Sequence, residues 1–173
     1  MNKLINGFNG DIDRREQIIF GKNYDRNNNN HLSRDLKGTD IAHSNEVYDK
    51  YYVGGIKYFN NLTVNKLEDL VNENFIDPNS VSSDAYGCPS VAEFIKFAHK
   101  IKQLEDTDNL DITFGGYAVC PEREDYRVSI YKISFSSNNS YRINREAVKM
   151  FWDFVKTASS IECNDSNGKG IWD

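Results

Sequence analysis

The chain has 173 residues, a net charge of −5 and a pI near 5.2, with 39% hydrophobic and 27% charged residues. A chain of this length can bury enough apolar surface to fold around one core without a metal or a disulfide. The composition is too aromatic for a disordered protein, and no apolar run approaches the roughly 20 residues of a membrane-spanning helix. The acidic balance disfavours direct nucleic-acid binding, which depends on Lys and Arg. We therefore expect a soluble protein without a nucleic-acid or membrane partner.

Residues 1–44 form the least regular part of the sequence, since Gly7, Gly10, Gly21 and Gly38 interrupt two short apolar pieces. We predict an irregular N-terminal arm with short helices. The aromatic residues around the Gly54-Gly55 pair match either a helix stop or a two-residue hairpin turn. The aromatic flanks favour a strand after Gly55.

Three segments have the apolar spacing of amphipathic helices. Thr63 is a good N-cap for a helix over 64–74, and Ser90 and Glu93 have the spacing of a capping box for a helix over 91–104. Asn144 can cap a third helix over 145–158, and we expect its buried stripe to consist of Val148, Phe151, Trp152 and Val155. These caps predict where each helix begins.

Between the second and third helices the apolar period changes to that of strands. One strand begins near Ile112 and is interrupted at Gly115-Gly116, where we expect a bulge or a strand break. The next alternates through Tyr126, Val128 and Ile130, then shifts phase to Tyr131, Ile133 and Phe135. A shift of one residue predicts a β-bulge. The charged residues 122–125 would join the two strands as a hairpin loop.

These elements predict an α+β fold, with an antiparallel sheet of three or more strands and about three amphipathic helices packed on it. We assign residues 1–44 to the arm, 45–160 to the core domain and 161–173 to a loose C-terminal tail, because that tail is polar and contains glycine.

Several sequence patterns partly resemble chemical sites. Residues 25–36 place oxygen-bearing side chains at several positions of a calcium loop, but Leu36 stands where the bidentate carboxylate belongs. A second fragment, 165–170, has Lys169 at a ligand position. The paired glycines lack the context of a phosphate-binding loop. We expect no metal and no cofactor.

The three cysteines, Cys88, Cys120 and Cys163, form no Cys-x-x-Cys pair and no even disulfide set, which favours a reducing, cytoplasmic setting. Cys88 precedes a helix N-terminus, where the helix dipole would lower its pKa and favour a nucleophile. His43 and His99 are the candidate bases. A small buried hydrophobe is the competing interpretation of Cys88.

Two groups of residues are the best candidates for binding a partner. Loops on a rigid sheet often carry binding residues, and Tyr offers a large contact area at low entropic cost. The candidates are Tyr48, Tyr51, Tyr52 and Tyr58 in one segment and Glu122, Arg123, Glu124 and Asp125 in the hairpin loop.

With no assembled catalytic set, we expect a non-enzymatic, acidic protein-binding module. Inhibitor, immunity and anti-defence proteins of bacteria and phages are a class with this character. Two alternatives remain open. One is an enzyme with a Cys88 nucleophile, and the other is a small-molecule binder with a pocket between the sheet and the helices.

Overall fold

The computed structural model describes residues 4–5, 7–22, 56–82, 86–104, 110–119, 127–137 and 143–173. The helices are α1 (Ile12–Phe20), α2 (Val64–Asn72), α3 (Val91–Lys102) and α4 (Arg145–Val155). The strands are β1 (Leu4–Ile5), β2 (Phe8–Asn9), β3 (Ile56–Thr63), β4 (Leu110–Val119), β5 (Val128–Ser137), β6 (Ser160–Cys163) and β7 (Asn167–Ile171). None of the helices in these ranges is long and apolar enough to cross a membrane.

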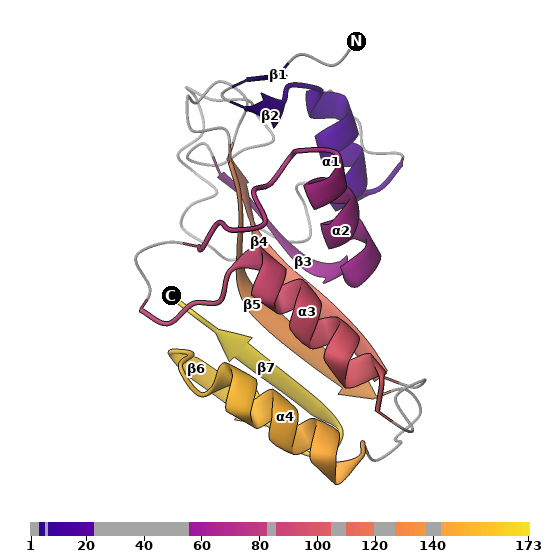
Figure 1. Ribbon diagram of the computed structural model, residues 1–173, viewed down its shortest axis with the longest axis vertical. Coiled ribbons are helices and arrows are strands. Elements are labelled where there is room, and N and C mark those ends of the chain that lie inside the picture. The colour runs from indigo at the N-terminus through magenta and orange to yellow at the C-terminus, as the bar shows by residue number, and fades with distance from the viewer. Residues whose placement is uncertain are drawn as a thin grey trace, which may run out of the picture.

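The larger sheet has five antiparallel strands in the order β3-β4-β5-β7-β6, and β1 and β2 form a separate two-stranded sheet. All four helices lie on one face of the larger sheet (Figure 1). This arrangement confirms the predicted α+β fold. It leaves the other face of the sheet without a helix from the described ranges.

The predicted caps begin the helices at the expected residues. The Thr63 side chain accepts from the Lys66 amide, and the Asn144 side chain accepts from the Glu146 amide. At α3 the Glu93 amide donates to Ser90 Oγ at 3.2 Å while the Ser90 amide donates to Glu93 Oε2 at 2.7 Å. The capping box therefore forms as the sequence predicts.

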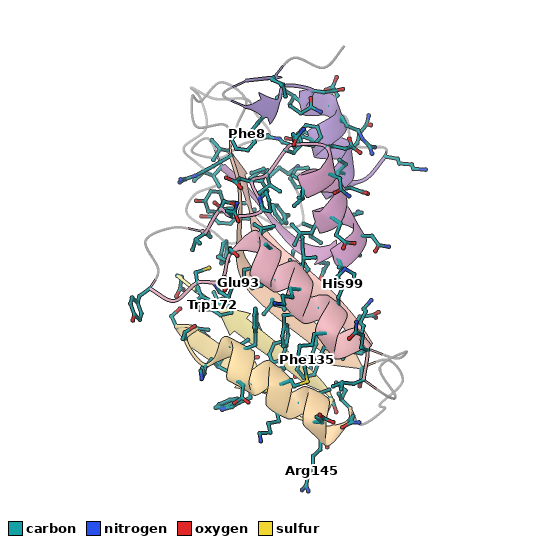
Figure 2. All side chains as sticks on the ribbon, viewed as in Figure 1. Phe8, Glu93, His99, Phe135, Arg145 and Trp172 are labelled. Carbon is teal, nitrogen blue, oxygen red and sulfur yellow. The ribbon has the colours of Figure 1, made fainter. Side chains whose placement is uncertain are left out.

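The core lies between the helices and the sheet and is rich in aromatic rings. Phe94 of α3 is fully buried, and its ring centroid lies 5.7 Å from that of Phe114 and 5.5 Å from that of Trp172. Phe135 of β5 packs edge-to-face on Phe151 of α4 at 4.5 Å. Figure 2 shows Phe135 and Trp172 between α3 and α4. These contacts join the helix layer to β4, to β5 and to Trp172 near the end of the chain.

The predicted bulge is present in β5, at Tyr131. Gly115 pairs with Lys132 but Gly116 pairs with Ile130, so Tyr131 is the additional residue. Our prediction that Tyr131 shares a face with Ile133 is wrong, because the bulge turns Ile130 and Ile133 toward the helices. Tyr131 and Lys132 lie on the other face instead.

A second bulge lies in β3, opposite the same glycines of β4. Phe59 pairs with Gly116 and Leu62 pairs with Phe114, so Asn60 and Asn61 fill the interval. Asn61 has a φ of 61°, a left-handed conformation that Asn tolerates. β4 itself continues through Gly115 and Gly116.

The prediction of a loose tail over residues 161–173 is wrong. Its residues form most of β6 and all of β7, and Trp172 is 1% exposed. A Cβ on Gly168 would lie 2.3 Å from the Phe135 ring, and one on Gly170 would lie 2.6 Å from Val155 Cγ1. The tail lacks an apolar pattern because its glycines leave space for side chains from β5 and α4.

The described part of the N-terminal arm packs on the body. The Asn9 amide donates to the Asn74 carbonyl at 2.8 Å. Arg15 and Glu16 of α1 are fully buried, and Arg15 Nη2 donates to the Val119 carbonyl of β4 at 3.0 Å. The arm's predicted short helix is α1, and residues 23–44 of the predicted arm lie outside the described ranges.

Candidate functional site

The face of the larger sheet opposite the helices carries mostly polar side chains, and we call it the open face. Cross-strand pairing places Tyr58 opposite Tyr117, Thr113 opposite Ser134, and Ser134 opposite Lys169. Pairs directly opposite one another in an antiparallel sheet share a face. We define the open face by its polar and aromatic residues together with Ile171. They are Tyr58, Asn60, Asp111, Thr113, Tyr117, Tyr131, Lys132, Ser134, Ser136, Glu162, Lys169 and Ile171.

Three tyrosines form a continuous row across β3, β4 and β5. The ring centroids of Tyr58 and Tyr117 lie 6.1 Å apart, and those of Tyr117 and Tyr131 lie 6.3 Å apart. Rings this close are in contact, so no cation fits between them as in an aromatic cage. The row is therefore a surface on which another molecule can lie.

Burial raises the pKa of the Tyr131 phenol, and the nearby Tyr58, Asp173 and Tyr117 add to this effect. The hydroxyl therefore keeps its proton at neutral pH and can donate a hydrogen bond. The guanidinium carbon of Arg127 lies 5.8 Å from the Tyr117 ring centroid, within reach of a cation–π contact. The tyrosine row thus combines apolar rings with polar groups at their edges.

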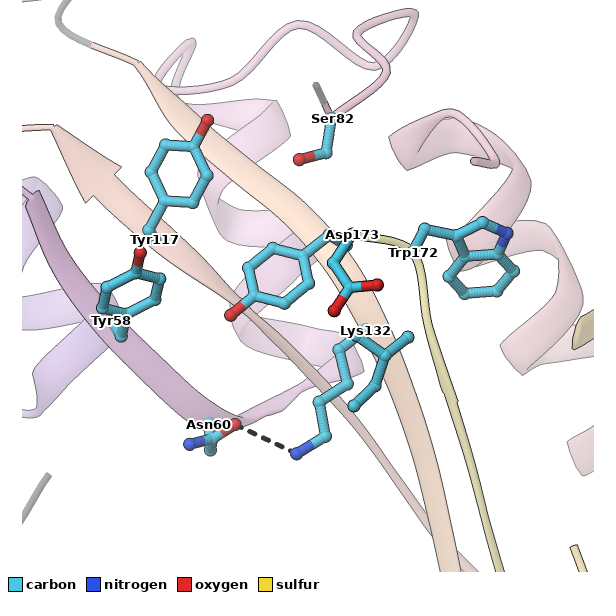
Figure 3. Close-up of a pocket in the computed structure, with 9 residues that line it drawn as sticks. Tyr58, Asn60, Ser82, Tyr117, Lys132, Trp172 and Asp173 are labelled. Atoms are coloured by element: carbon cyan, nitrogen blue, oxygen red, sulfur yellow. Dashed lines mark hydrogen bonds between the residues drawn. The ribbon is translucent and has the colours of Figure 1, made fainter. Parts of the chain in front are cut away.

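A pocket of about 440 Å³ lies beside the tyrosine row (Figure 3). It is lined by Tyr58, Asn60, Ser82, Tyr117, Tyr131, Lys132, Ile171, Trp172 and Asp173. Small-molecule sites commonly have volumes of about 300–1,000 Å³ and combine apolar walls with a few polar groups. This pocket has that size and that composition.

Lys132 and Asn60 meet at one end of this pocket. Lys132 Nζ donates to Asn60 Oδ1 at 3.2 Å, across β4. A Cβ on Gly115 would lie 3.0 Å from Lys132 Cδ and 3.1 Å from Asn60 Oδ1, so the glycine permits their approach. Burial lowers the pKa of Lys132, and Lys169 lowers it further while Glu162 raises it. The Lys132 ammonium is thus held by a neutral oxygen.

Ser82 and Asp173 lie on another side of the pocket. Ser82 is 3% exposed, and its hydroxyl has no hydrogen-bond partner among the described residues. In Figure 3 this hydroxyl points toward the side where Tyr117 lies. The Ser159 hydroxyl donates to the Asp173 carboxylate, and the Asp173 amide donates to Ser159 Oγ at 3.1 Å. The pocket therefore offers a hydroxyl and a carboxylate on a different side from Lys132.

Of the residues predicted to bind a partner, Tyr58 lies in the tyrosine row. Tyr48, Tyr51 and Tyr52 lie outside the described ranges, as do the loop residues Glu122, Arg123, Glu124 and Asp125. β4 and β5 pair as the predicted hairpin, and the intervening loop follows Val119, two residues after Tyr117.

Sequence reasoning missed Tyr117, Tyr131 and Lys132 as members of this surface. The phase shift in the second strand was the available signal, because a bulge places two successive side chains on one face. The pairing of Tyr58 with Tyr117 depends on strand order, which no local pattern shows.

The structure does not favour Cys88 as a nucleophile. The side chain is buried, and this burial raises the pKa of the thiol to about 11. Glu93, in the first turn of α3, raises it further, although a hydrogen bond from the Ser82 backbone opposes the shift. The expected effect of the helix dipole is thus outweighed. His99 lies in the second half of α3 (Figure 2), where its Nε2 is 2.5 Å from Glu68 Oε1.

Of the two calcium-loop-like fragments in the sequence, only 165–170 lies in the described ranges. Within them, no group of three or more His, Cys, Asp or Glu side chains is placed to hold a metal. The fragment 165–170 forms the turn between β6 and β7 and the following strand, and Asn164 Oδ1 accepts from the amides of Ser166 and Asn167 at 2.8 and 2.9 Å. Residues 25–36 lie outside the described ranges.

Comparison of the chain with protein-family models, curated proteins and solved structures finds no match.

Proposed function

We propose that this chain is a non-enzymatic protein-binding module whose interaction surface is centred on the tyrosine row. The observation that carries the proposal is the position of Tyr58, Tyr117 and Tyr131 side by side on the sheet face opposite the helices. Tyrosine is enriched at the energetic centres of protein interfaces. Half-buried rings are also held in place before binding, which reduces the entropic cost of association.

The charges of the open face support a protein partner over a nucleic acid. Lys132 and Lys169 are accompanied by Asp111 and Glu162, and Lys169 Nζ lies 3.0 Å from Glu162 Oε1. A phosphate backbone is bound by a surplus of cations, which this surface lacks. The hairpin loop between β4 and β5 carries Glu122, Glu124 and Asp125, and its negative charge would steer a basic partner.

We further place the protein among small acidic inhibitors, immunity proteins and anti-defence proteins of bacteria or phages, acting in the cytoplasm. Free thiols at Cys88 and Cys163 support a reducing compartment. The class assignment rests on the α+β fold, the acidic charge and a surface on which the described residues form no assembled catalytic set.

The experiment is affinity capture with the tagged chain in its native cells, followed by binding kinetics with the captured protein. Tyr117→Ala should weaken binding by about 2 kcal/mol or more, mainly through faster dissociation. Trp152→Ala is the matched control, because Trp152 is an aromatic residue on α4 that is 51% exposed. Equal loss in both variants, or no loss in Tyr117→Ala, would refute the assignment of the surface.

The hairpin loop is tested in the same assay. Replacing Glu122, Glu124 and Asp125 with Ser should slow association and reduce its dependence on salt, while dissociation stays unchanged. Tyr51→Ala and Tyr52→Ala should accelerate dissociation if that segment joins the interface. Unchanged kinetics in all of these variants would limit the interface to the open face.

The second candidate function, small-molecule binding, is favoured by one observation, the 440 Å³ pocket beside the tyrosine row. The pocket lies on the open face, whereas the sequence-based alternative expected it between the sheet and the helices.

A further inference from the structure

The open-face pocket has one positive end. Among the described residues that line it, Lys132 is the only cation and Asp173 the only carboxylate. Lys132 Nζ bonds to the neutral Asn60 Oδ1, while the neighbouring Lys169 bonds to Glu162. An ammonium group has three donors, and a carboxylate is the acceptor that best balances its charge. The Lys132 end of the pocket is therefore suited to an anionic group.

The walls of the pocket suit an apolar, ring-sized body. The rings of Tyr58, Tyr117 and Tyr131 form one side, and Ile171 contributes an aliphatic side chain. Aromatic rings stack on tyrosine with a gain beyond that of area burial alone. The volume of about 440 Å³ accommodates one ring with a short side chain.

The other polar groups select against a second negative charge and in favour of a hydrogen-bond donor. Asp173 lies close enough to Tyr131 to raise the pKa of its phenol, so its field reaches into the pocket. The buried Ser82 hydroxyl has no partner among the described residues, and such a group gains most from a ligand that satisfies it. A phosphate dianion would face Asp173, whereas a hydroxyl would find acceptors in Asp173 and Ser82.

We infer that the pocket binds a small organic monocarboxylate with a ring-sized apolar body and a hydrogen-bond donor at its far end. The carboxylate lies at Lys132 and Asn60, the ring lies against the tyrosine row, and the donor lies on the side of the pocket that Ser82 and Asp173 line. The inference rests on the proposed function in treating the open face as a binding surface. The same chemistry can come from a free hydroxyaryl carboxylate or from the C-terminal tyrosine of a partner protein.

The test uses the purified full chain and 3-(4-hydroxyphenyl)propionate as the probe, with binding followed by NMR shifts of the β4 and β5 amides. A ligand of this size is expected to bind with a Kd on the order of 1 mM. The corresponding amide, which lacks the charge, should bind at least about tenfold more weakly. Equal affinity for acid and amide, or no shift at about 10 mM acid, would overturn the inference.

Variants then assign the two ends of the pocket. Lys132→Met should reduce the affinity for the acid at least about tenfold, whereas Lys149→Met, on the exposed side of α4, should not change it. Ser82→Ala should remove the preference for the hydroxylated acid over 3-phenylpropionate. Retained affinity in Lys132→Met, in a variant that keeps the wild-type melting curve, would overturn the inference.

A second pair of probes separates the two sources. A short peptide that ends in Tyr with a free carboxylate is compared with the same peptide amidated at its C-terminus. If 3-(4-hydroxyphenyl)propionate binds and neither peptide does, the pocket is a small-molecule site. If the peptide with the free carboxylate binds and the amidated peptide does not, the pocket is a site for a partner's C-terminus. Both support the inferred chemistry. The probes need no captured protein, so failure of protein capture and failure of the pocket are separate results.

Discussion

The two faces of the sheet use the same strands in different ways. On the helix face, Phe94, Phe114 and Trp172 interlock, and Gly168 leaves its space to the Phe135 ring. On the open face, the tyrosines are half-buried and a pocket lies beside them. The bulge at Tyr131 connects the two, because it keeps both Ile130 and Ile133 in the core while it turns Tyr131 and Lys132 outward. We propose that helix-face residues determine stability and that open-face residues determine binding.

The strongest test of this division is a truncation in the aromatic core. Phe94→Ala should lower the free energy of unfolding by about 3–5 kcal/mol, because it removes a fully buried ring that contacts Phe114, Phe154 and Trp172. Denaturant unfolding measures this change. A loss below about 1 kcal/mol would show that the core is not packed as described.

A pair of glycine substitutions compares the two faces directly. Gly168→Ala should cost about 1–3 kcal/mol, because its Cβ would lie 2.3 Å from the Phe135 ring, which Phe151 holds from the other side. Gly115→Ala, on the open face, meets Lys132 and Asn60 at 3.0–3.2 Å, and these flexible side chains can move aside. Thermal melts of the two variants should therefore differ. An equal or larger loss in Gly115→Ala would contradict the comparison.

The α3 capping box is expected to have a smaller effect. Ser90→Ala removes the acceptor for the Glu93 amide and should lower stability by about 1 kcal/mol. Ser90→Asp keeps an acceptor at the N-cap and should restore most of this loss. The check is the melting temperature, and a Ser90→Ala protein that melts like the wild type would exclude Ser90 as the cap.

The smallest change in stability is expected on the open face itself. Lys132→Met should stay within about 0.5 kcal/mol of the wild type, since the burial that lowers the Lys132 pKa disfavours its charged form. Chemical denaturation measures this difference. A loss of about 2 kcal/mol or more would mean that Lys132 supports the fold and not a ligand.

Local signals were sufficient for the parts of the fold that depend on local chemistry. The caps at Thr63, Ser90 and Asn144 and the apolar stripes that follow them predicted α2, α3 and α4. The β4–β5 hairpin and its bulge were predicted from alternation alone. These features need only residues that are neighbours along the chain.

Features that depend on distant residues were not predictable in the same way. β7 pairs with β5 although its glycines give no apolar alternation, because Phe135 and Val155 fill their space. The tyrosine row needs β3 beside β4, and the pocket also needs Ser82 and Asp173 in its lining. Only Tyr58 of this site was among the predicted binding residues, and it was chosen for its residue type, not for its neighbours.

A lysine footprint tests whether the open face binds the partner, as we propose. The wild-type protein is acetylated alone and saturated with its captured partner, and each lysine is quantified by mass spectrometry. Lys132 and Lys169 should become protected, while Lys96 of α3 and Lys149 of α4, on the outer surface of the helix layer, should react as before. Protection of Lys96 and Lys149 with Lys132 and Lys169 unchanged would contradict the account.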